Sequence, residues 1–539
     1  MNQTGQAHQF VVQRLLAQLQ ASKHRLKVAD STGTKLTGEQ LLIRTLALRR
    51  YLMREVIGQD EENVGIFLPP SAPAVATNLA VTLCGRVAVN LNYTVTSAVL
   101  RECSEVAGLK HVLTSRRFVE KVNLDPGCPL VFLEDIKDKI SLTDKIWAAV
   151  NAKLRSAAGL MRATGMTRKC SSDPVTIIFT SGSTGVPKGV VLSFENIDSN
   201  VRGIDARVRL NADDMVLGVL PFFHSFGYSI TLWGAMTLPS AAAYHFSPLD
   251  ARQIGKLAQD FGATVLLATP TFLRTYIRRV EREQFSKLDV VVLGAEKMPL
   301  ALAEDFEKQF GVRPVEGYGT TELSPLVSVN VPPSRANARD NIGWREGTVG
   351  QTIERVEARV VALDDETPLP TGESGLLEIR GPNVMLGYYK RPDLTAQAMH
   401  DQWYRTGDVA RIDEQGFIEI TGRLSRFSKI GGEMVPHIQI EETMAAILGA
   451  QEDGSMSVAI TSVPDEKKGE RLVVLHRPLG IEKRELLAKM SLAGLPNLYL
   501  PGEDSFLEVE AIPALGSGKL DLKAIKDLAN ARFGPKVAG

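Results

Sequence analysis

Residues 175–189, VTIIFTSGSTGVPKG, place a polar, glycine-rich loop directly after a run of β-branched and aromatic residues. The run VTIIFT (175–180) predicts a buried strand. Glycines let the backbone fold closely round an anion, while hydroxyls and a lysine supply hydrogen-bond donors and positive charge. The residues of this predicted phosphate-binding loop are Thr180, Ser181, Gly182, Ser183, Thr184, Gly185, Val186, Pro187, Lys188 and Gly189.

Two other interpretations of the loop fit the sequence less well. It is not a Walker A loop, because the pattern G-x-x-x-x-G-K-[ST] is absent. A flexible Ser/Gly linker is the second interpretation, but linkers rarely follow a buried strand with this density of Thr, Lys and Gly. We therefore interpret the segment as a site for a phosphate group.

Short β-branched runs recur along the chain, and helix-like stretches lie between many of them. The runs are ATVLLAT (263–269), LDVVVLG (288–294) and RVEARVVAL (355–363), and ALAEDFEKQF (301–310) carries apolar residues at helical spacing. This alternation predicts an α/β fold. A chain of 539 residues is long enough for more than one domain.

The bulk composition is that of an ordinary soluble protein, with 44% hydrophobic and 23% charged residues. Lys+Arg and Asp+Glu are equal at 62 each, which argues against a general nucleic-acid binder. The cysteines form no C-x-x-C pair and have no histidine at metal-ligand spacing, so we expect reduced, structural thiols in a cytoplasmic protein. They are Cys84, Cys103, Cys128 and Cys170. The first ten residues contain no basic stretch followed by an apolar run, so we expect no secretory signal.

Two segments are apolar enough to be weighed as membrane spans. Residues 215–249 contain no Asp, Glu, Lys or Arg, and their length would cross a bilayer. They are interrupted by Pro221, His224 and Pro239, and residues 64–85 contain three prolines. We expect a buried strand, loop and helix in each case rather than a membrane span.

The composition shifts at two places. Residues 137–169 are basic and carry apolar residues at helical spacing, which are Ile146, Trp147, Val150, Leu154, Ala157 and Met161. A solvated helix that packs one face on the domain is the first interpretation, and contact with a membrane or an acidic partner is the alternative. At 421–433 a polar stretch with glycines follows the strand-like GFIEI (416–420), which predicts a hinge or a domain boundary.

The loop TSGSTGVPKG (180–189) resembles the phosphate-loop signature of the adenylate-forming superfamily, which includes acyl-CoA synthetases, peptide-synthetase adenylation domains and luciferases. Further motifs of this superfamily follow in order over nearly the whole chain. The resemblance implies a large N-terminal adenylation domain of mixed sheets and helices (1–423) and a small, mobile C-terminal α+β domain (424–539). It also implies ATP and Mg²⁺ as cofactors.

The motif Tyr318-Gly319-Thr320-Thr321-Glu322 matches Y-G-x-T-E of the superfamily. By resemblance, Tyr318 stacks near adenine, Thr321 contacts the α-phosphate and Glu322 binds Mg²⁺. A carboxylate substrate and ATP are both anionic, and a metal ion offsets their repulsion.

Two further segments resemble parts of the nucleotide and acyl sites. Gly294, Ala295 and Glu296 follow a predicted strand, and in the superfamily this turn lies against adenine, where little side-chain bulk suits a flat ring. The segment PFFH (221–224) resembles the wall of the acyl pocket. The substrate-binding residues implied there are Phe223, His224 and Gly227, although a lone histidine such as His224 is also typical of a satisfied core residue.

The segment WYRTGD (403–408) resembles the one whose aspartate binds both ribose hydroxyls, and one carboxylate suits a vicinal diol. A helix cap or a turn is the other interpretation of Asp408. Arg423 matches the arginine that contacts ribose and phosphate.

Lys519, in GSGK (516–519), matches the C-terminal catalytic lysine, whose charge would stabilise the transferring phosphorus centre. The implied catalytic residues are therefore Lys188, Thr321, Glu322 and Lys519. The C-terminal domain would close with Lys519 and then rotate about a hinge, placed by register at Arg426, where many relatives have Asp. A pantetheine thiol would then attack the acyl-AMP, and no nucleophile of the enzyme is required.

Three runs resemble most closely one branch, the acyl-ACP synthetase part of bifunctional acylglycerophosphoethanolamine acyltransferase/acyl-ACP synthetases. They are residues 422–435, 317–332 and 512–522. This implies that a fatty acid is loaded onto holo-acyl carrier protein for recycling into phospholipid, at the inner membrane face or in the cytoplasm. We expect a free-standing synthetase, because there is no room for an acyltransferase domain before the adenylating part.

An acidic carrier protein would prefer a basic docking face. Residues 137–169 are one candidate, and Lys467, Lys468 and Arg471 are another.

Two alternatives to an acyl-ACP synthetase remain at this stage. An acyl-CoA ligase would run the same chemistry with a different thiol. A non-catalytic acyl- or nucleotide-binding relative, or a lipid adaptor, predicts the loss of Lys519, Glu322 or Lys188, all of which are present. Amino-acid activation is disfavoured, because the F-D-x-S of such enzymes corresponds to FGYS (226–229), which offers no carboxylate to an ammonium group. The apolar residues nearby suit an acyl chain or an ordinary core, and they are Phe222, Phe223, Phe226, Ile230, Leu232, Trp233 and Met236.

Overall fold

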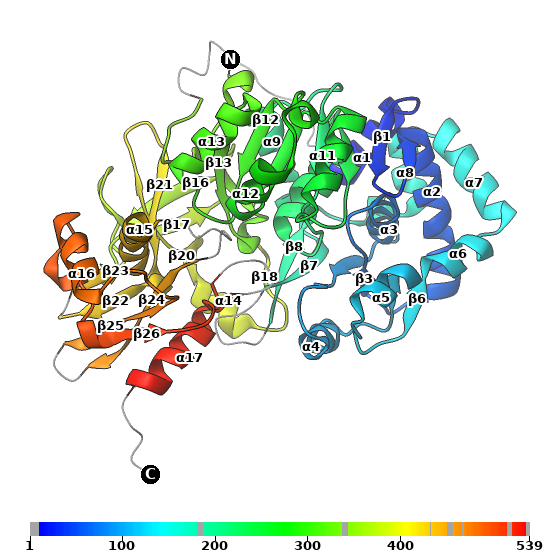
Figure 1. Cartoon of the computed structure of the whole chain (residues 1–539). Coiled ribbons are helices and arrows are strands. Elements are labelled where there is room, and N and C mark those ends of the chain that lie inside the picture. Colours follow the sequence, from blue (N-terminus) through cyan, green and yellow to red (C-terminus); the bar gives the residue numbers. More distant parts are fainter. Residues whose placement is uncertain are drawn as a thin grey trace, which may run out of the picture.

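The computed structural model describes residues 10–180, 187–336, 343–431, 433–449, 456–465, 468–514 and 520–534. Within these ranges the strands form four sheets. The first three sheets belong to a large N-terminal part, and the fourth belongs to a smaller C-terminal part, coloured orange to red in Figure 1.

The nine-stranded sheet is parallel through its six central strands, from β13 to β1. These strands are almost continuously apolar, as expected when both faces of a sheet are covered. The runs predicted at 263–269 and 288–294 form β11 and β12. The strands, in spatial order, are β15 (Gln351–Thr352), β14 (Leu326–Val329), β13 (Val315–Gly319), β12 (Val290–Leu293), β11 (Val265–Ala268), β9 (Met215–Gly218), β10 (Ala241–Tyr244), β1 (Leu26–Asp30) and β2 (Lys35–Thr37).

The seven-stranded sheet contains the strand predicted at 175–180. This strand is β7, and it pairs antiparallel with β8, so that Thr180 lies opposite Lys188. The predicted phosphate loop therefore connects two antiparallel neighbours. The strands, in spatial order, are β18 (Gly387–Tyr388), β8 (Lys188–Ser193), β7 (Pro174–Thr180), β4 (Val87–Asn90), β3 (Asn63–Phe67), β5 (Val112–Thr114) and β6 (Leu130–Phe132).

Helices and the two large sheets alternate in layers (Figure 1). In β7, Ile178 faces the core between the sheets and Ile177 faces the outer core, because successive strand residues point to opposite faces. One outer layer consists of α11 (Ala251–Phe261), α12 (Pro270–Arg279) and α13 (Leu300–Phe310). The middle layer, between the two sheets, includes α3 (Ala72–Leu83), α9 (Phe194–Arg207) and η3 (Phe226–Gly234). The other outer layer consists of α4 (Ser97–Ala107) and α5 (Arg116–Val122). The helices α1 (Val11–Ala21) and α2 (Gly38–Tyr51) pack against the same central core.

Two five-stranded sheets complete the described structure. The third sheet consists of β16 (Glu357–Val361), β17 (Gly375–Arg380), β20 (Trp403–Ile412) and β19 (Met399–His400), with β21 (Ile418–Arg423) also paired to β20. The fourth consists of β23 (Glu433–Pro436), β22 (Phe427–Ile430), β25 (Gly469–His476) and β24 (Val458–Asp465), with β26 (Phe506–Glu508) also paired to β25.

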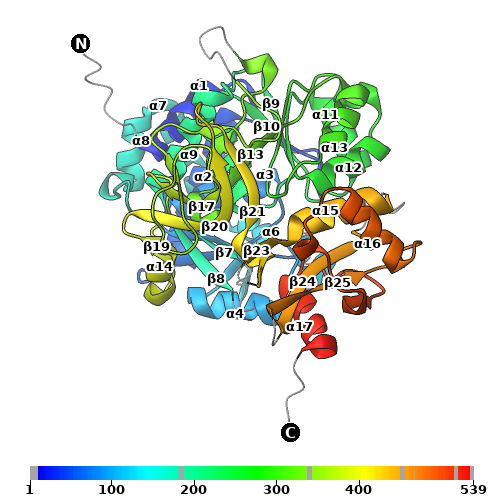
Figure 2. The same cartoon turned by 90° about the vertical axis from the view of Figure 1, so that its left-hand side faces the viewer.

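The fourth sheet has hydrophobic cores on both faces, separate from those of the N-terminal part. The helices α15 (His437–Leu448) and α16 (Lys483–Leu492) cover one face, and α17 (Leu522–Phe533) covers the other (Figure 2). The predicted fold class, a large α/β N-terminal part with a small α+β C-terminal part, is confirmed. The boundary placed between residues 423 and 424 stays a prediction; β21 ends at Arg423, and a short helix, η7 (Leu424–Arg426), follows.

The two long apolar segments are interior elements, as expected. Residues 215–249 form β9, η3, α10 (Ala235–Thr237) and β10, and residues 64–85 form most of β3 and α3. In the described part of the chain, no helix is long and apolar enough to cross a membrane.

The basic segment 137–169 contains the end of α6 (Leu133–Lys139), then α7 (Leu142–Leu154) and α8 (Ala157–Thr164). Helix α7 packs one face on the domain, as the first interpretation expected, but Ile146 and Val150 lie on the exposed face instead of the packed one. The reason is that Asp144, on the buried face, is held by arginines of the preceding helical segment.

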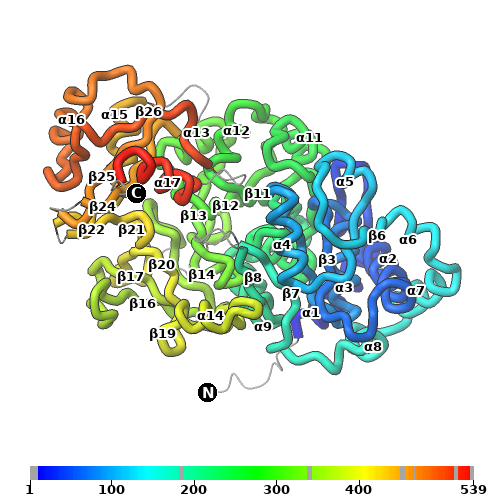
Figure 3. The backbone as a smooth tube through the Cα atoms, turned by 90° about the horizontal axis from the view of Figure 1, so that it is seen from below, coloured from blue at the N-terminus to red at the C-terminus, as the bar shows by residue number. Residues whose placement is uncertain are grey.

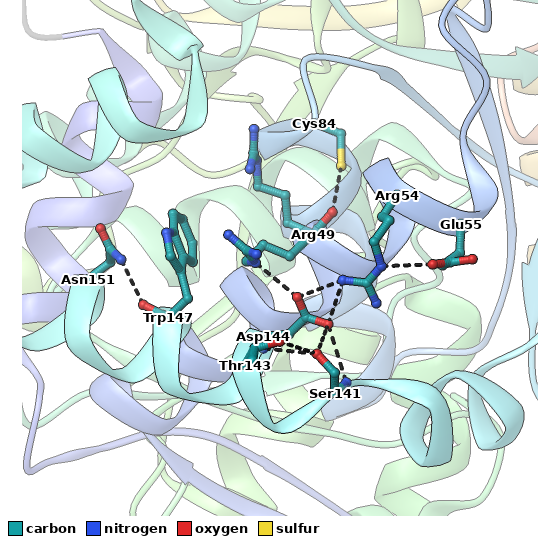
Figure 4. Close-up of polar contacts among 10 residues, drawn as sticks. Arg49, Arg54, Glu55, Cys84, Ser141, Thr143, Asp144, Trp147 and Asn151 are labelled. Carbon is teal, nitrogen blue, oxygen red and sulfur yellow. Dashed lines mark hydrogen bonds and ion pairs between the residues drawn. The ribbon is translucent and has the colours of Figure 1, made fainter.

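The carboxylate of Asp144 is fully buried and accepts hydrogen bonds from Arg54 at 2.8 Å (Figure 4) and from Arg50 at 2.9 Å. The hydroxyl of Ser141 donates to it at 2.7 Å. Burial alone would raise the pKa of Asp144, but these hydrogen bonds lower it below its usual range. The charged form is therefore the one that stabilises the fold.

We expect Asp144→Asn to lower the free energy of unfolding by about 1–3 kcal/mol at pH 7, because it leaves Arg50 and Arg54 facing a neutral buried amide. The folded-state pKa is depressed, so the contribution is present above the unfolded value of 3.8 and is lost as the pH falls below it. Denaturant unfolding of both proteins at several pH values measures the difference in the free energy of unfolding. The exposed Asp138→Asn is the control, and equal effects of the two substitutions at pH 7 would contradict the assignment.

Candidate active site

Three of the predicted motif segments follow parallel strands of the nine-stranded sheet. Residues 221–224 come soon after β9, residues 294–296 follow β12, and residues 320–322 follow β13. Parallel strands end at the same edge of a sheet, and in open α/β sheets ligands bind outside this carboxyl edge. The structure therefore brings segments about 100 residues apart in sequence to one edge.

Side-chain contacts join these segments. The hydroxyl of Ser225 donates to that of Thr321 at 3.3 Å. A β-carbon added to Gly294 would lie 3.3 Å from the ring of Phe226, so the turn after β12 lies against the aromatic segment. Ser225 was not among the residues predicted for the site, whereas Phe226 was among the apolar residues proposed for an acyl pocket or an ordinary core.

The turn at residues 294–296 is shaped by local hydrogen bonds. Ala295 has a positive φ of 69°. The carboxylate of Glu296 accepts hydrogen bonds from the backbone N–H and the hydroxyl of Thr271, at 3.3 and 2.8 Å, in the first turn of α12. Its second oxygen is buried without a partner among the described residues. Glu296 therefore anchors the turn to α12 and leaves one buried acceptor unused.

A tyrosine joins the nine-stranded sheet to the third sheet. The hydroxyl of Tyr318, at the end of β13, donates to Asp408 Oδ2 at 2.5 Å. Asp408 lies within β20, opposite Arg423 of β21, and Arg423 Nε is 3.6 Å from Asp408 Oδ1. Burial and the charge of Asp408 raise the pKa of Tyr318 well above its usual value, so the hydroxyl stays a donor. The interpretation of Asp408 as a helix cap or turn residue is wrong, because it is a strand residue.

A second tyrosine joins three more elements. The hydroxyl of Tyr388, in β18, donates to Glu322 Oε1 at 2.8 Å, and Glu322 lies in the short helix η5 (Thr321–Leu323). Lys188 Nζ, at the start of β8, is 5.4 Å from the centroid of the Tyr388 ring. Burial, and then the charge of Glu322, raise the pKa of Tyr388 above its usual range. Sequence analysis missed Tyr388, because only the pairing of β18 with β8 brings it to the site.

The residues present at η5 fit a magnesium ion. Within the described part of the chain, the second carboxylate oxygen of Glu322 accepts no hydrogen bond. The hydroxyl of the adjacent Thr320 is buried without a partner there. Oxygen donors of this kind are the ligands that Mg²⁺ prefers, and a buried polar atom without a partner is uncommon in a folded protein.

A second group of possible metal ligands lies on the third sheet, where the ligand atoms of Glu366, Glu378 and His400 are within 4.8 Å of one another. Arg359 pairs with Glu378 at 2.6 Å, and Arg405 pairs with Glu366. With both carboxylates already paired, this group is an ion-pair cluster.

Six of the predicted site residues lie outside the described residues. They are Ser181, Gly182, Ser183, Thr184, Gly185 and Lys519, and Lys467 of the predicted docking face lies outside as well. The described flanks of both segments are paired, Thr180 with Lys188 and Ala514 with Leu520.

The predicted acyl-pocket residues differ in their burial. Phe223 is buried, whereas His224 is exposed with its ring 4.5 Å from the ring of Phe223, so the interpretation of His224 as a core histidine is wrong. A β-carbon on Gly227 would lie 2.0 Å from the carbonyl oxygen of Pro221, so the backbone approach requires glycine there. Phe222 and Trp233 are fully buried in the central core, which supports the ordinary-core interpretation for them.

Comparisons with known proteins agree with this geometry. A family model described as "AMP-binding enzyme" matches residues 16–389. The chain therefore belongs to the AMP-binding enzymes, which confirms the adenylate-forming superfamily indicated by its motifs.

Two curated relatives are named "Long-chain-fatty-acid--CoA ligase". The protein from Salmonella typhimurium is 26% identical over 533 residues, covering 94% of this chain and 92% of the relative. The protein from Escherichia coli O6:H1 is 29% identical over 367 residues, and the match covers 67% of this chain and 62% of the relative. Among solved structures, ATP-bound MatB from Rhodopseudomonas palustris superposes with a TM-score of 0.79 at 23% identity, covering 97% of this chain and 99% of that chain. The last comparison concerns the fold alone.

We expect Gly319→Ala to lower the free energy of unfolding by about 2 kcal/mol or more, because a β-carbon there would lie 1.8 Å from the carbonyl oxygen of Pro325 and the backbone would have to shift. Thermal and denaturant unfolding measure the loss. The matched control is Gly234→Ala, where the nearest atom would be 3.4 Å away. A Gly319→Ala protein as stable as the control would contradict the close approach at the end of β13.

Proposed function

We propose that this protein uses ATP and Mg²⁺ to convert a fatty acid into its acyl-AMP and then transfers the acyl group to a phosphopantetheine thiol. The observation that carries the proposal is the pair of tyrosine contacts, Tyr318 to Asp408 and Tyr388 to Glu322, at the carboxyl edge of one sheet. They orient the carboxylates of Asp408 and Glu322, and the Tyr388 ring also lies 5.4 Å from Lys188 Nζ.

The nucleotide would occupy this edge. Asp408 accepts the ribose hydroxyls, with Arg423 beside it, and the adenine lies between Tyr318 and the turn at 294–296. Asp408 is positioned for this because it is nearly buried in β20 and aligned by the tyrosine and the arginine. A carboxylate with two oxygens suits a vicinal diol.

The phosphates would lie between η5 and the start of β8. Glu322 would hold Mg²⁺ through its second oxygen, and the hydroxyls of Thr320 and Thr321 would face the α-phosphate. The ion supplies charge neutralisation between the substrate carboxylate and the triphosphate. Lys188 and the loop at 180–189 supply further positive charge and donors.

In the reaction, a carboxylate oxygen attacks the α-phosphorus, a new oxygen–phosphorus bond forms, and pyrophosphate leaves. Lys519 stabilises the negative charge that develops on the phosphorus centre. The acyl carbon of the mixed anhydride is then attacked by a thiolate, and AMP leaves as the thioester forms. No side chain of the enzyme becomes covalently attached.

Two separate sources support the identities proposed for the acid and for the thiol acceptor. The names of the curated relatives support a long-chain fatty acid and CoA. The resemblance of three runs to the acyl-ACP synthetase branch supports holo-acyl carrier protein, which we place first, with CoA as the second candidate. Of the predicted docking residues, Lys468 is exposed, whereas Arg471 lies 3.4 Å from Asp504.

Two paired arginines, Arg423 and the predicted hinge residue Arg426, flank residues 424–425. Arg423 belongs to β21 and faces Asp408 of the N-terminal part. Arg426 is buried and pairs with Glu441 of α15, whose other oxygen accepts the backbone N–H of Ile460 at 2.6 Å. Arg426 is thus tied to the C-terminal part, and we propose that the rotating backbone torsions lie at residues 424–425, next to the predicted hinge residue.

We expect Asp408→Ala to weaken ATP binding by roughly 10- to 100-fold, the cost of losing charge-assisted hydrogen bonds to the ribose. Isothermal titration with ATP and the ATP dependence of acyl-AMP formation measure it. The exposed Asp364→Ala is the control. An unchanged ATP dependence in Asp408→Ala would remove this residue from the nucleotide site.

We expect Lys519→Ala to reduce acyl-AMP formation by at least about 100-fold, as when a stabilising charge is removed from a transition state. Transfer from supplied acyl-AMP to the thiol should stay within a few-fold of the unaltered enzyme. Pyrophosphate release and thioester formation are measured separately, with Lys523→Ala as the control. An equal loss in both half-reactions would show that Lys519 does not act specifically in adenylation.

The decisive experiment is a thiol-acceptor assay in which purified protein receives Mg-ATP, a panel of fatty acids and either holo-acyl carrier protein or CoA. Thioester is detected by mass. Product on the carrier protein alone supports the first candidate acceptor, and product on CoA alone supports the second. AMP and thioester absent with every acid and both acceptors would contradict the proposed function.

A further inference from the structure

Helix α7 exposes a continuous apolar stripe. Its residues Leu142, Ile146, Val150 and Leu154 have relative exposures of 71, 54, 47 and 79%. Residues four apart on a helix lie on the same face. The four aliphatic side chains therefore form one row along the solvent side of a three-turn helix.

The opposite face of α7 is anchored, so the stripe cannot turn into the core. Asp144 is hydrogen-bonded to Arg54 (Figure 4) and to Arg50, and the guanidinium of Arg50 lies 4.8 Å from the centroid of the Trp147 ring. Ser141 and Asp144 form a capping box at the start of the helix. The N-terminal half of α7 is therefore fixed by contacts with α2 and the segment after it.

The surface around the stripe is positively charged. Lys145 and Lys153 are exposed on α7 itself, and the other exposed cations within residues 137–169 are Lys137, Lys139, Arg155, Arg162 and Arg168. Asp138 is the exposed acid within 137–169, because Asp144 is buried and paired. An apolar row with flanking lysines is the pattern of helices that lie in the interface of an anionic membrane.

The position of α7 argues against a role in delivering a thiol to the site. In Figures 1, 2 and 3, α7 lies at the rim of the N-terminal part, far from α15, α16 and α17. A carrier protein must bring its pantetheine to the sheet edge described above, which this rim does not border. A lipid surface has no such requirement.

We propose that α7 lies on the surface of a bilayer that contains anionic lipids, with Leu142, Ile146, Val150 and Leu154 entering the boundary between headgroups and acyl chains. Lys145 and Lys153 contact the lipid phosphates. This attachment does not depend on catalysis, and it places the protein at the membrane from which a lipid substrate would be taken.

The test is flotation of the purified full-length protein with vesicles of phosphatidylcholine, with and without phosphatidylglycerol. We expect binding to the anionic vesicles that weakens as salt rises. The double variant Ile146→Ser, Val150→Ser should reduce the partition coefficient by at least about ten-fold. Lys145→Glu with Lys153→Glu should reduce it by a similar factor.

Matched controls carry the same changes elsewhere on the surface. Leu249→Ser with Leu492→Ser alters two aliphatic side chains that are 56 and 88% exposed, and Lys256→Glu with Lys308→Glu alters two exposed lysines. Both controls should bind vesicles like the unaltered protein. Circular dichroism melting confirms that every variant is folded.

Four results would overturn the proposal. They are absence of binding to anionic vesicles, equal binding by the stripe variants and their controls, a protein dimer that the stripe variants dissociate in sedimentation, and loss of carrier-protein binding in the same variants. The last two would assign the stripe to a protein partner instead of a lipid surface.

Discussion

The parallel alignment of β9, β11, β12 and β13 is the constraint on which the rest of the site depends. Because these strands share a direction, every segment that leaves them emerges at one edge of the nine-stranded sheet. The short polar and glycine-containing segments at this edge could not otherwise meet, since they are separated by whole helices in sequence. The layers of helices on both faces bury the sheet and keep this edge as its accessible boundary.

Two tyrosines then connect this edge to elements from other sheets. Tyr318 fixes Asp408 of the third sheet, and Tyr388 fixes Glu322 beside the start of β8. Both hydroxyls remain protonated because burial and a neighbouring carboxylate raise their pKa values. Each carboxylate thus has one oxygen oriented by a neutral donor, and Asp408 also has Arg423 beside its other oxygen. Oriented carboxylates of this kind are suited to a diol on one side and a cation on the other.

Paired side chains also anchor the two sides of the junction between the N-terminal and C-terminal parts. Arg423 belongs with Asp408 on one side of the junction, and Arg426 is buried with Glu441 on the other. The backbone between Arg423 and Arg426 takes part in neither of these two contacts. At the opposite end of the molecule, Asp144 anchors α7 by its polar face and leaves the aliphatic face to solvent. In both places a buried ion pair decides which surface of an element faces inward.

The sequence by itself determined the fold class, the strands and helices with strong periodicity, the family and the segments that gather at the site. These are properties of local pattern: β7 and β12 are apolar runs bounded by glycine, and the motif at 318–322 is contiguous. Only the tertiary structure decided that Tyr388 reaches Glu322, that His224 is exposed and that the aliphatic residues of α7 face solvent. Each of these depends on pairing between distant segments, such as β18 with β8 or Asp144 with Arg54, and a short-range pattern does not encode which distant partner will be close.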